Sequence, residues 1–489
     1  MGSFILILYF YSLFFISKGS TPNKAVDAKT IYDPKFTSDS LRKYIDTDEI
    51  PCNNLYNFAC GNWIKDRKRE SKYLHYSFDY RPTTENFKSL IEETDHNDSI
   101  RGQSTVVDQI LNLRGLCVAV EPFHSMHECR RVVIEFGTYA LATLFINRNR
   151  KNSEERNDYI VVEDMVKRIK EEFIKLIDER RDTFDEYSIN NVLHKFNNIT
   201  FSIKSDDFDF TNVKLMEACY KNTTIDFHNA TVSNIGDIVN AIKHQQSITK
   251  NENLMWTCRE KIFNPSVYLK HHVYSTVKYH PVYNIIYISS DALTEPSFSI
   301  KFPNALNYGY LGFSIAQAIL EGFDTKNINY NFNNVYPKKK QKSLMSEVSM
   351  NDMIEFSKCF TRELNDQRRI IHNTAIDDVL STDNKLADNA GLKIAYRAYK
   401  NFVKSYGEEN IFVPGFTKYS DDQFFFISFG RHFCEHTTGD NYVPYYDKPG
   451  KVLAAERTNS ILKNYNEFSN TFHCEHWNSL LHTKTCQVW

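Results

Sequence analysis

The stretch that decides the fold is Asn304–Asp324, which reads NALNYGYLGFSIAQAILEGFD. Its later part, 311–323, predicts a helix, because Leu311, Ile315 and Ile319 recur every four positions and further apolar residues cover a second face. A helix that is apolar on two faces is usually buried in a large protein. Its polar side chains lie three or four positions apart and form one stripe: Ser314, Gln317, Glu321 and Asp324. A buried helix with one polar stripe either lines a site or satisfies a buried network.

This stretch resembles the active-site helix of the neprilysin and endothelin-converting-enzyme family of zinc metalloendopeptidases, where the segment reads roughly NYGxIGxxIGHEITHGFDD. The catalytic positions differ, within the run Gln317-Ala318-Ile319-Leu320-Glu321. Gln317 stands where the family has its first zinc histidine, Ala318 replaces the general-base glutamate, and Glu321 replaces the second zinc histidine. The matching positions surround them: Asn307, Tyr308, Gly309, Gly312, Ile315, Ile319, Gly322, Phe323 and Asp324. The resemblance implies the family's scaffold without its catalytic groups.

Further motifs of the family follow in the same order along the chain. Residues 52–63 (CNNLYNFACGNW) are similar to its CxDFYxYACGxW signature, and 383–400 (DNKLADNAGLKIAYRAYK) to ENIADNGGLKAAYRAY. Pro414-Gly415 with 421–434 (DDQFFFISFGRHFC) resembles PGLxxxxxQLFFLSFAQxWC, and the end of the chain, CQVW, resembles Cys-Arg-Val-Trp. The resemblance implies a mainly α fold with small β elements, in the two-lobed, α-rich arrangement of these metallopeptidases.

The resemblance also predicts the domain organisation. Residues 20–45 are polar without clear periodicity and are expected to be a linker, followed by one neprilysin-like domain over 46–489. Its first lobe is expected over 46–115 with 260–489, and its second lobe over 116–259. The second lobe is shorter than in active relatives, so we expect a shortened lid over the cleft. Amphipathic helices are predicted over 84–116 and 121–190, and loops with short surface helices over 196–260.

The N-terminal segment, MGSFILILYFYSLFFISKGS, has an apolar run over 4–16. Crossing a bilayer takes about 20 apolar residues, so this run is short for a membrane span. Small residues at Ser17 and Gly19 suit cleavage after Gly19, and we interpret residues 1–19 as the signal peptide of a secreted, extracellular protein. An uncleaved anchor is the alternative, because many relatives in the family are anchored by one N-terminal helix.

Ten cysteines, an even number, after a secretory signal indicate disulfide bonds made in an oxidising compartment. Four Asn-x-Ser/Thr sequons predict a glycoprotein: Asn97, Asn198, Asn222 and Asn229. The family resemblance implies four disulfides: Cys52–Cys474, Cys60–Cys434, Cys117–Cys258 and Cys359–Cys486. Cys129 and Cys219 remain and would pair with each other.

The resemblance places the other functional positions of the family as well. Its third zinc ligand, a glutamate, falls on Asn384, and the aspartate that orients its first zinc histidine is retained as Asp388. Aligned on Pro449-Gly450, its transition-state histidine falls on Asp447 and its substrate arginine on Leu453.

Residues 283–293 (YNIIYISSDAL) are rich in β-branched and aromatic residues and predict a strand. They are similar to NEIVFPAGIL, the family's edge strand, which pairs with bound peptide beside the zinc. The resemblance thus makes Asn284, Ile286 and Ile288 candidate peptide-binding residues. The family's substrate-gripping asparagine falls on Thr276, a further candidate.

Zinc hydrolysis requires three protein ligands and an open position for water, with a general base beside it. Gln317 and Asn384 are poor zinc ligands, which leaves Glu321 alone, so we expect no zinc cofactor and no useful peptidase activity. Glu321 could bind a hard cation with Asp388 and Asp324, or be paired in a buried network with a raised pKa. We expect Asp388 to cap or hydrogen-bond within the old site, with Gln317 as a candidate partner.

Residues 432–436 (HFCEH) fit the H-x-x-E-H pattern of inverted zinc peptidases. The resemblance pairs the central Cys434 with Cys60, so we interpret the pattern as a chance match. His271-His272 has no partner at ligand spacing and is expected at the surface. The sequence contains no P-loop, dinucleotide-binding motif or nucleophile elbow.

Three functions remain open. The first is a secreted pseudopeptidase that binds extracellular peptides or proteins without cleaving them. The second is a structural or interaction glycoprotein that uses its outer surface, favoured if side chains such as Tyr310, in place of a family glycine, fill the cleft. The third is a residual zinc metalloendopeptidase with a rebuilt site, acting on extracellular peptides. A net charge of −2 implies no nucleic-acid partner, and a membrane contact is expected only if the N-terminal segment stays uncleaved.

Overall fold

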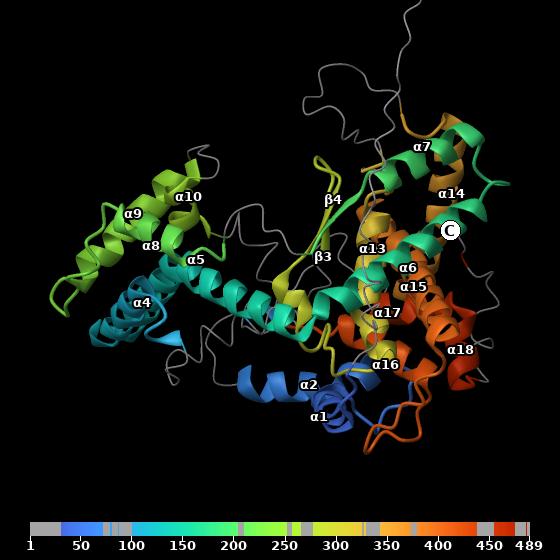
Figure 1. Cartoon of the computed structure of the whole chain (residues 1–489), viewed down its shortest axis with the longest axis horizontal. Helices are drawn as coiled ribbons and strands as arrows, with labels where there is room; N and C mark the ends of the chain where they lie inside the picture. The colour runs from blue at the N-terminus through green and yellow to red at the C-terminus, as the bar shows by residue number, and fades with distance from the viewer. Residues whose placement is uncertain are drawn as a thin grey trace, which may run out of the picture.

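A computed structural model gives the arrangement of the chain (Figure 1). It describes residues 31–71, 79–80, 87, 100–203, 210–251, 257–265, 277–324, 327–328, 343–372, 379–437, 454–474 and 486. The described chain is mostly helical and its strands are short, which confirms the expected mainly α fold with small β elements. Its buried apolar side chains form two separate hydrophobic cores.

The larger core is assembled from segments that lie far apart in the sequence. Its N-terminal and middle helices are α1 (Pro34–Tyr44), α2 (Leu55–Ser71), α6 (Asp158–Asp178) and α7 (Glu186–Asn197). Its later elements are η3 (Ser290–Leu293), α12 (Asn304–Asn307), the π-helical turn η4 (Tyr308–Gly312), α13 (Phe313–Glu321), α14 (Glu347–His372), α15 (Val379–Tyr406), α16 (Asp421–His432), α17 (Ala454–Lys463) and α18 (Asn466–Phe472).

Two small sheets accompany this core. The first pairs β2 (Thr200–Ser202), β4 (Ile285–Ile288) and β3 (Val277–His280) in the order β2-β4-β3, with β2 parallel to β4 and β3 antiparallel to it. The second pairs β1 (Asp79–Tyr80) with β5 (His436–Thr437).

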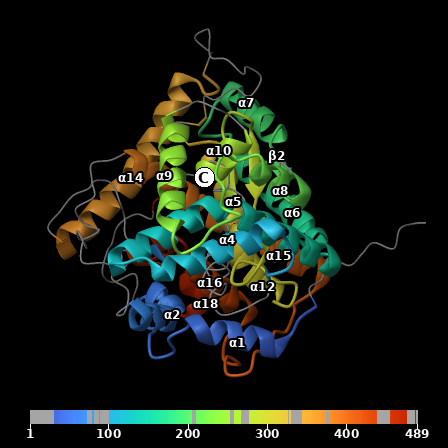
Figure 2. The same ribbon diagram turned by 90° about the vertical axis from the view of Figure 1, so that its left-hand side faces the viewer.

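The smaller core lies in a group of helices set apart from the rest, on the left of Figure 1 and facing the viewer in Figure 2. Its elements are α4 (Thr105–Leu116), η2 (Cys117–Ala119), α5 (Phe123–Arg156), α8 (Val213–Lys221), α9 (Ile235–Asn251) and α10 (Cys258–Phe263). Phe136 of α5 is fully buried at its centre and packs edge-on against Tyr220 and Phe227. The long helix α5 reaches from this group toward the larger core, where it contacts η3.

The division between the two cores differs from the expected lobes, 46–115 with 260–489 and 116–259. The helix α4 belongs to the smaller core, whereas α6 and α7 belong to the larger one. Amphipathic periodicity shows that one face of a helix is buried but does not show against which partner, and this is why the boundaries were misplaced. The segment 196–260, expected as surface loops and short helices, includes the 17-residue helix α9, whose Ile242 is fully buried.

The expected linker, 20–45, also contains a helix of the core. The N-cap Asp33 accepts a hydrogen bond from the Phe36 amide, and Pro34 occupies the first turn. Asp-Pro is a helix-start signal, because the carboxylate satisfies a free amide and proline has none to satisfy. Leu41 and Tyr44 of this helix, α1, are buried in the larger core.

The structure contains five disulfides, which pair all ten cysteines. Three of the implied pairs are confirmed: Cys52–Cys474, Cys60–Cys434 and Cys359–Cys486. The expected Cys117–Cys258 and Cys129–Cys219 bonds are wrong, because Cys117 pairs with Cys129 and Cys219 with Cys258. Cys117 directly follows α4 and Cys129 lies near the start of α5, so the short connection between the two helices brings their Cα atoms to 5.6 Å.

Three of the sequon asparagines are described, Asn198, Asn222 and Asn229, and all three are exposed. Asn97, His271-His272 and residues 1–30, with the expected signal peptide, lie outside the described residues. Within the described part of the chain, we find no helix with the length and apolar character that a membrane span requires.

Candidate functional site

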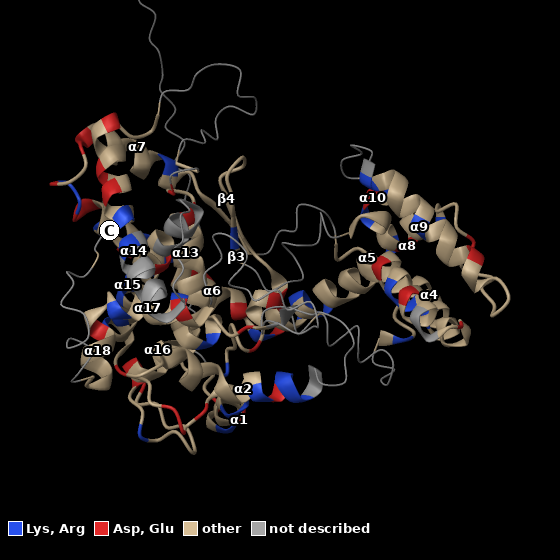
Figure 3. Ribbon diagram, turned by 180° about the vertical axis from the view of Figure 1, so that it is seen from behind, with Lys and Arg blue, Asp and Glu red and all other residues tan. Residues whose placement is uncertain are grey.

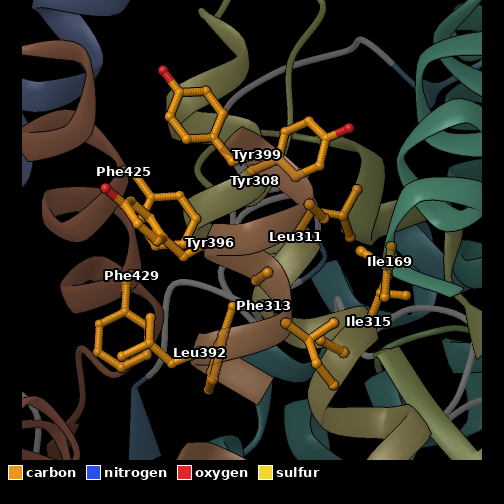
Figure 4. Close-up of a cluster of buried hydrophobic side chains, with 14 of the residues drawn as sticks. Ile169, Tyr308, Leu311, Phe313, Ile315, Leu392, Tyr396, Tyr399, Phe425 and Phe429 are labelled. Atoms are coloured by element: carbon orange, nitrogen blue, oxygen red, sulfur yellow. The ribbon is translucent and has the colours of Figure 1, made fainter. Parts of the chain in front are cut away.

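The helix α13 lies at the centre of the larger core, where it packs against α15, while η4 packs against α16 (Figure 4). Two glycines permit this close packing. A Cβ atom at Gly309 would lie 2.2 Å from the Phe425 carbonyl oxygen, and one at Gly391 would lie 3.2 Å from the Gln317 amide nitrogen. Backbone can approach this closely only where a residue has no side chain. Gly391 thus sets α15 directly beside the polar stripe of α13.

The site is built around the Asp388 carboxylate on α15, which is fully buried. Gln317 donates a hydrogen bond from Nε2 to its Oδ1 at 2.5 Å. Arg457 of α17 donates from Nε to Oδ2 at 2.5 Å and from Nη2 to Oδ1 at 2.7 Å. Both carboxylate oxygens are therefore occupied, and the expected contact between Asp388 and Gln317 is confirmed. The Arg457 guanidinium also lies over the Phe433 ring, 5.2 Å from its centroid.

The electrostatics of this network favour a charged Arg457. Burial alone would lower the pKa of the guanidinium, but Asp388, Glu321 and Glu435 nearby raise it above its ordinary value. The ion pair with Asp388 is asymmetric, because 30% of the arginine side chain is exposed and none of the aspartate side chain. The arginine thus supplies a positive charge beside a carboxylate that would otherwise be buried alone.

Glu321 lies on the same polar stripe of α13. Burial raises the pKa of its carboxyl to about 7; Asp324 and Asp388 raise it as well, while Lys278 and Arg457 oppose the shift. This carboxyl therefore carries only part of a negative charge at neutral pH. The expectation of a raised pKa in a buried network is met.

The residues at the former ligand positions do not fit a zinc ion. The Gln317 side chain directs its amide nitrogen, which cannot bind a metal, to Asp388. The described residues contain no group of three or more His, Cys, Asp or Glu side chains that could hold a metal ion. Asn384 lies in α15, but its side chain is outside the described part, as are Asp447 and Leu453.

Arg457 is the residue of this site that the sequence did not predict. An alignment anchored on Pro449-Gly450 assigned the arginine position to Leu453, four residues earlier. The structure brings Arg457 to Asp388, which the alignment had retained. A search of the amphipathic segment 454–463 for a cation at the site would have found it, since this segment has one arginine.

The pattern at 432–436 does not form one cluster. The His432 Nδ1 lies 3.2 Å from the Ser314 hydroxyl, whereas Cys434 is bonded to Cys60. The Glu435 carboxylate accepts a hydrogen bond from the Ala454 amide at the start of α17. His436 lies in β5, where burial lowers the pKa of its imidazole. The cysteine and glutamate of this pattern thus serve the scaffold.

The strand 283–293, expected at the edge of a sheet, is central in the described sheet, and peptide binding there stays a prediction. β4, where it was placed, is paired with β2 on one side and β3 on the other, so β2 and β3 are the outer strands of the described sheet. Ile286 and Ile288 are buried in the core, and Asn284 is 1% exposed and donates a hydrogen bond to the Lys195 carbonyl. The β-rich composition of 283–293 indicates burial equally for a central strand and an edge strand. Thr276 lies outside the described residues.

The outer strand β3 lies directly beside the site. It packs against α13, and its exposed Lys278 faces Glu321 closely enough to lower the pKa of that carboxyl. Lys278 and Arg457 thus flank Glu321 from two different elements.

The fold and this site define an α-rich metallopeptidase scaffold with an amide, a carboxylate and a guanidinium joined at its centre. The model of the family described as "Peptidase family M13" matches residues 277–488. Over this part, the chain is similar to neprilysin and endothelin-converting enzyme.

Curated relatives with similar sequences have names that fit this family model. Neprilysin from Homo sapiens is 30% identical over 219 residues, which cover 42% of this chain and 27% of the relative. Neprilysin-1 from Caenorhabditis elegans is 28% identical over 211 residues, covering 43% and 27%. Endothelin-converting enzyme 1 from Rattus norvegicus is 27% identical over 213 residues, covering 43% and 26%. The matched part thus spans about a quarter of each relative's length.

Two solved structures share the fold over a larger part of the chain. The Haemonchus galactose containing glycoprotein complex has a TM-score of 0.52 at 19% identity, covering 75% of this chain and 55% of that one. The open state of the Mycobacterium tuberculosis zinc metalloprotease Zmp1 has a TM-score of 0.51 at 16% identity, covering 78% and 55%. At these identities the similarity shows the fold alone.

Proposed function

We propose that the protein is a secreted, neprilysin-like pseudopeptidase that lacks the catalytic zinc and binds extracellular peptides or proteins without cleaving them. The observation that carries this proposal is the Asp388 carboxylate, whose two oxygens accept hydrogen bonds from Gln317 and Arg457. The network is complete without a metal ion, because the guanidinium provides the positive charge that the buried carboxylate requires.

The absence of hydrolysis follows from the groups at the former catalytic positions. Zinc peptidases need three ligands, and Gln317 donates its amide hydrogen to Asp388 instead of offering a lone pair. Ala318 cannot take a proton from water, and loss of a general base alone costs roughly 10² to 10⁴ in rate. Loss of ligands and base together leaves no route to a metal-activated water.

A binding role is supported by the elements around the network. β3 is an outer strand of the described sheet and lies against α13, so an extended peptide could add by main-chain hydrogen bonds to the edge that no described strand pairs with. Lys278 and Arg457, which both act on Glu321, would favour a peptide with acidic side chains.

An interaction glycoprotein that uses only its outer surface is the second candidate. The exposed sequons at Asn198, Asn222 and Asn229 favour it. So does Tyr310, which is 1% exposed and packs edge-on against His432 at 5.1 Å between centroids. In this alternative, the large side chains that replace small ones fill the former site.

Metal analysis of the purified protein tests the central claim. We expect less than one-tenth of an equivalent of zinc per chain and no cleavage of a mixed peptide library, with or without added zinc. Stoichiometric zinc, together with cleavage that a chelator abolishes, would instead establish the residual metallopeptidase.

Binding to the same library separates the two non-enzymatic candidates. Lys278→Glu places a negative charge beside Glu321 and should weaken peptide binding about tenfold, whereas Lys418→Glu on the exposed loop before α16 should leave it unchanged. Equal affinity of both variants, or no binding by the wild-type protein, would favour the outer-surface role.

A further inference from the structure

A hollow of about 590 Å³ opens between α6, α15 and the residues that join α17 to α18. Pockets that bind small molecules have volumes of roughly 300 to 1,000 Å³, so its size suits a ligand. Most ligand pockets are apolar, but charged and amide side chains dominate this lining. Its chemistry therefore points to a charged ligand.

Four cations line the hollow from one helix: Lys393, Arg397, Lys400 and Lys404 of α15. Their spacings of four, three and four residues place them in one stripe, about 16 Å long at 1.5 Å per residue. Figure 3 shows Lys and Arg gathered along α15. Like charges one turn apart on a helix repel each other, and Asp422, which pairs with Lys400 at 3.0 Å, offsets part of this repulsion.

Five cations line the hollow, the four of the stripe and Lys175, against three carboxylates, Glu172, Glu179 and Glu467. Glu179 of α6 bonds Arg397 at 2.6 Å and Lys393 at 3.4 Å, so two cations share one carboxylate. Arg180 does not line the hollow but is near enough to act on Lys393: burial, Arg397 and Arg180 lower the pKa of the Lys393 ammonium, against the influence of Glu179. Arg180 keeps its buried Nε without a hydrogen-bond partner among the described residues.

This hollow is separate from the Asp388 site. At 100° per residue, the four cations of the stripe lie on the opposite side of α15 from Asp388. Asp388 faces Gln317 of α13 and Arg457 of α17, neither of which lines the hollow. A ligand here can therefore be tested independently of peptide binding.

We propose that the hollow binds a ligand carrying several sulfate or phosphate ester groups. Guanidinium groups match tetrahedral oxyanions bidentately, and ammonium groups bind them as point charges. Asn389, Asn401 and Asn464 add amide groups to the lining. The stripe is longer than a single anion, so a ligand with several anionic groups can contact more of its cations. The net charge of the whole chain, −2, conceals this local excess of cations.

The test is calorimetric titration at low ionic strength with two probes, a heparin-derived hexasaccharide and inorganic pyrophosphate. The Arg180→Gln/Lys404→Gln double variant removes two cations and none of the ion pairs described above. It should weaken binding at least tenfold. Glu179→Gln removes the competing carboxylate and should strengthen binding about threefold. Lys358→Gln/Arg362→Gln on α14 removes the same charge away from the hollow and should change nothing.

The double variant with Arg180→Gln should weaken binding, whereas Glu179→Gln, at the neighbouring position, should strengthen it. A specific site and general charge attraction are told apart by comparing these two results with the α14 variant. Hexasaccharide binding with this pattern supports a sulfated glycan as the source of the anionic groups, and pyrophosphate binding alone supports a small phosphorylated ligand. The proposal is overturned if neither probe binds, if the α14 variant loses as much affinity as the double variant, or if Glu179→Gln binds no more tightly. Peptide binding by the double variant is measured separately. If it is unchanged, a negative result for the anionic ligand leaves the proposed peptide-binding function intact.

Discussion

The two hydrophobic cores are closed in different ways. The larger core brings together segments from both ends of the chain, and the Cys52–Cys474 and Cys60–Cys434 bonds join residues 422 and 374 positions apart. The bonds of the smaller core span only 12 and 39 positions, at Cys117–Cys129 and Cys219–Cys258. The long connections make the larger core one cooperative unit, whereas the smaller core can be held together by its own neighbours.

The family resemblance predicted the disulfides of the larger core correctly and those of the smaller core wrongly. Cys60 and Cys434 each lie in a quoted motif of the family, and their bond was predicted correctly. Cys129 and Cys219 lie in no such motif, and their pairing was wrong. The Cys52–Cys474 and Cys359–Cys486 bonds, each with one cysteine in a quoted motif, were also predicted correctly, so one such cysteine was enough.

The largest expected effect comes from removing one disulfide from each core. Chain entropy predicts that Cys60→Ala/Cys434→Ala lowers the free energy of unfolding by about 4 kcal/mol, because with Cys52–Cys474 intact the bond closes a loop of roughly 50 residues. Cys117→Ala/Cys129→Ala removes a bond that closes a short loop and should cost about 3 kcal/mol. Urea unfolding followed by tryptophan fluorescence and circular dichroism measures both. Equal losses would show that loop length does not distinguish the cores.

The second comparison sets a buried ion pair of the larger core against an exposed one near the smaller core. Asp388→Ala leaves the Arg457 guanidinium and the Gln317 amide without their acceptor, and should cost about 3 kcal/mol, less than for a fully buried pair because the arginine is partly exposed. Glu128→Ala breaks the surface pair with Arg131 and should cost about 0.5 kcal/mol.

A double-mutant cycle isolates the Asp388–Arg457 contact from other effects of the substitution. Adding Arg457→Met to Asp388→Ala should recover about 2 kcal/mol of the summed single losses, because neither variant group is then an unpaired charge. Additive losses would mean that the two side chains do not stabilise each other.

The sequence predicted the buried helix at the centre of the larger core, but not which elements surround the site. The apolar spacing of 311–323 and the stripe with Gln317 were enough to predict a buried helix whose polar side chains meet Asp388. Arg457 and the role of β3 were missed, because both depend on how separate elements are brought together. The partners of α4 and α6 were missed for the same reason, since helical periodicity does not name the core that a helix joins.

A third comparison uses one glycine from each core. Gly309→Ala would place a Cβ against the Phe425 carbonyl, which is backbone and cannot move aside, and should cost about 2 to 3 kcal/mol. Gly137→Ala would meet the Ile110 Cγ2 atom, and a side chain can shift further than backbone, so the expected cost is smaller, about 1 kcal/mol. Thermal unfolding of the two variants measures the difference. A larger loss at Gly137 would show that the smaller core is the more rigid one.

The smallest expected effect concerns Lys195, a lysine that the larger core buries almost completely. Its Nζ donates hydrogen bonds to the Gly322 and Asn327 carbonyls, and burial lowers the pKa of the ammonium to about 7, against the influence of Asp324. The folded protein therefore releases this proton near pH 7, while the unfolded chain keeps it until about pH 10. The unfolded state then binds more protons in this window, so the contribution of Lys195 to stability must rise with pH.

Urea unfolding between pH 7 and pH 9 tests this sign. The free energy of unfolding of the wild-type protein should rise by about 2 kcal/mol more over this interval than that of Lys195→Met, which has no proton to release. Lys418→Met, at an exposed position, should follow the wild-type curve. Comparing slopes removes the pH-independent cost of losing the two hydrogen bonds. Parallel curves for wild type and Lys195→Met would mean that the lysine stays charged in the core, held by Asp324 and the two carbonyls.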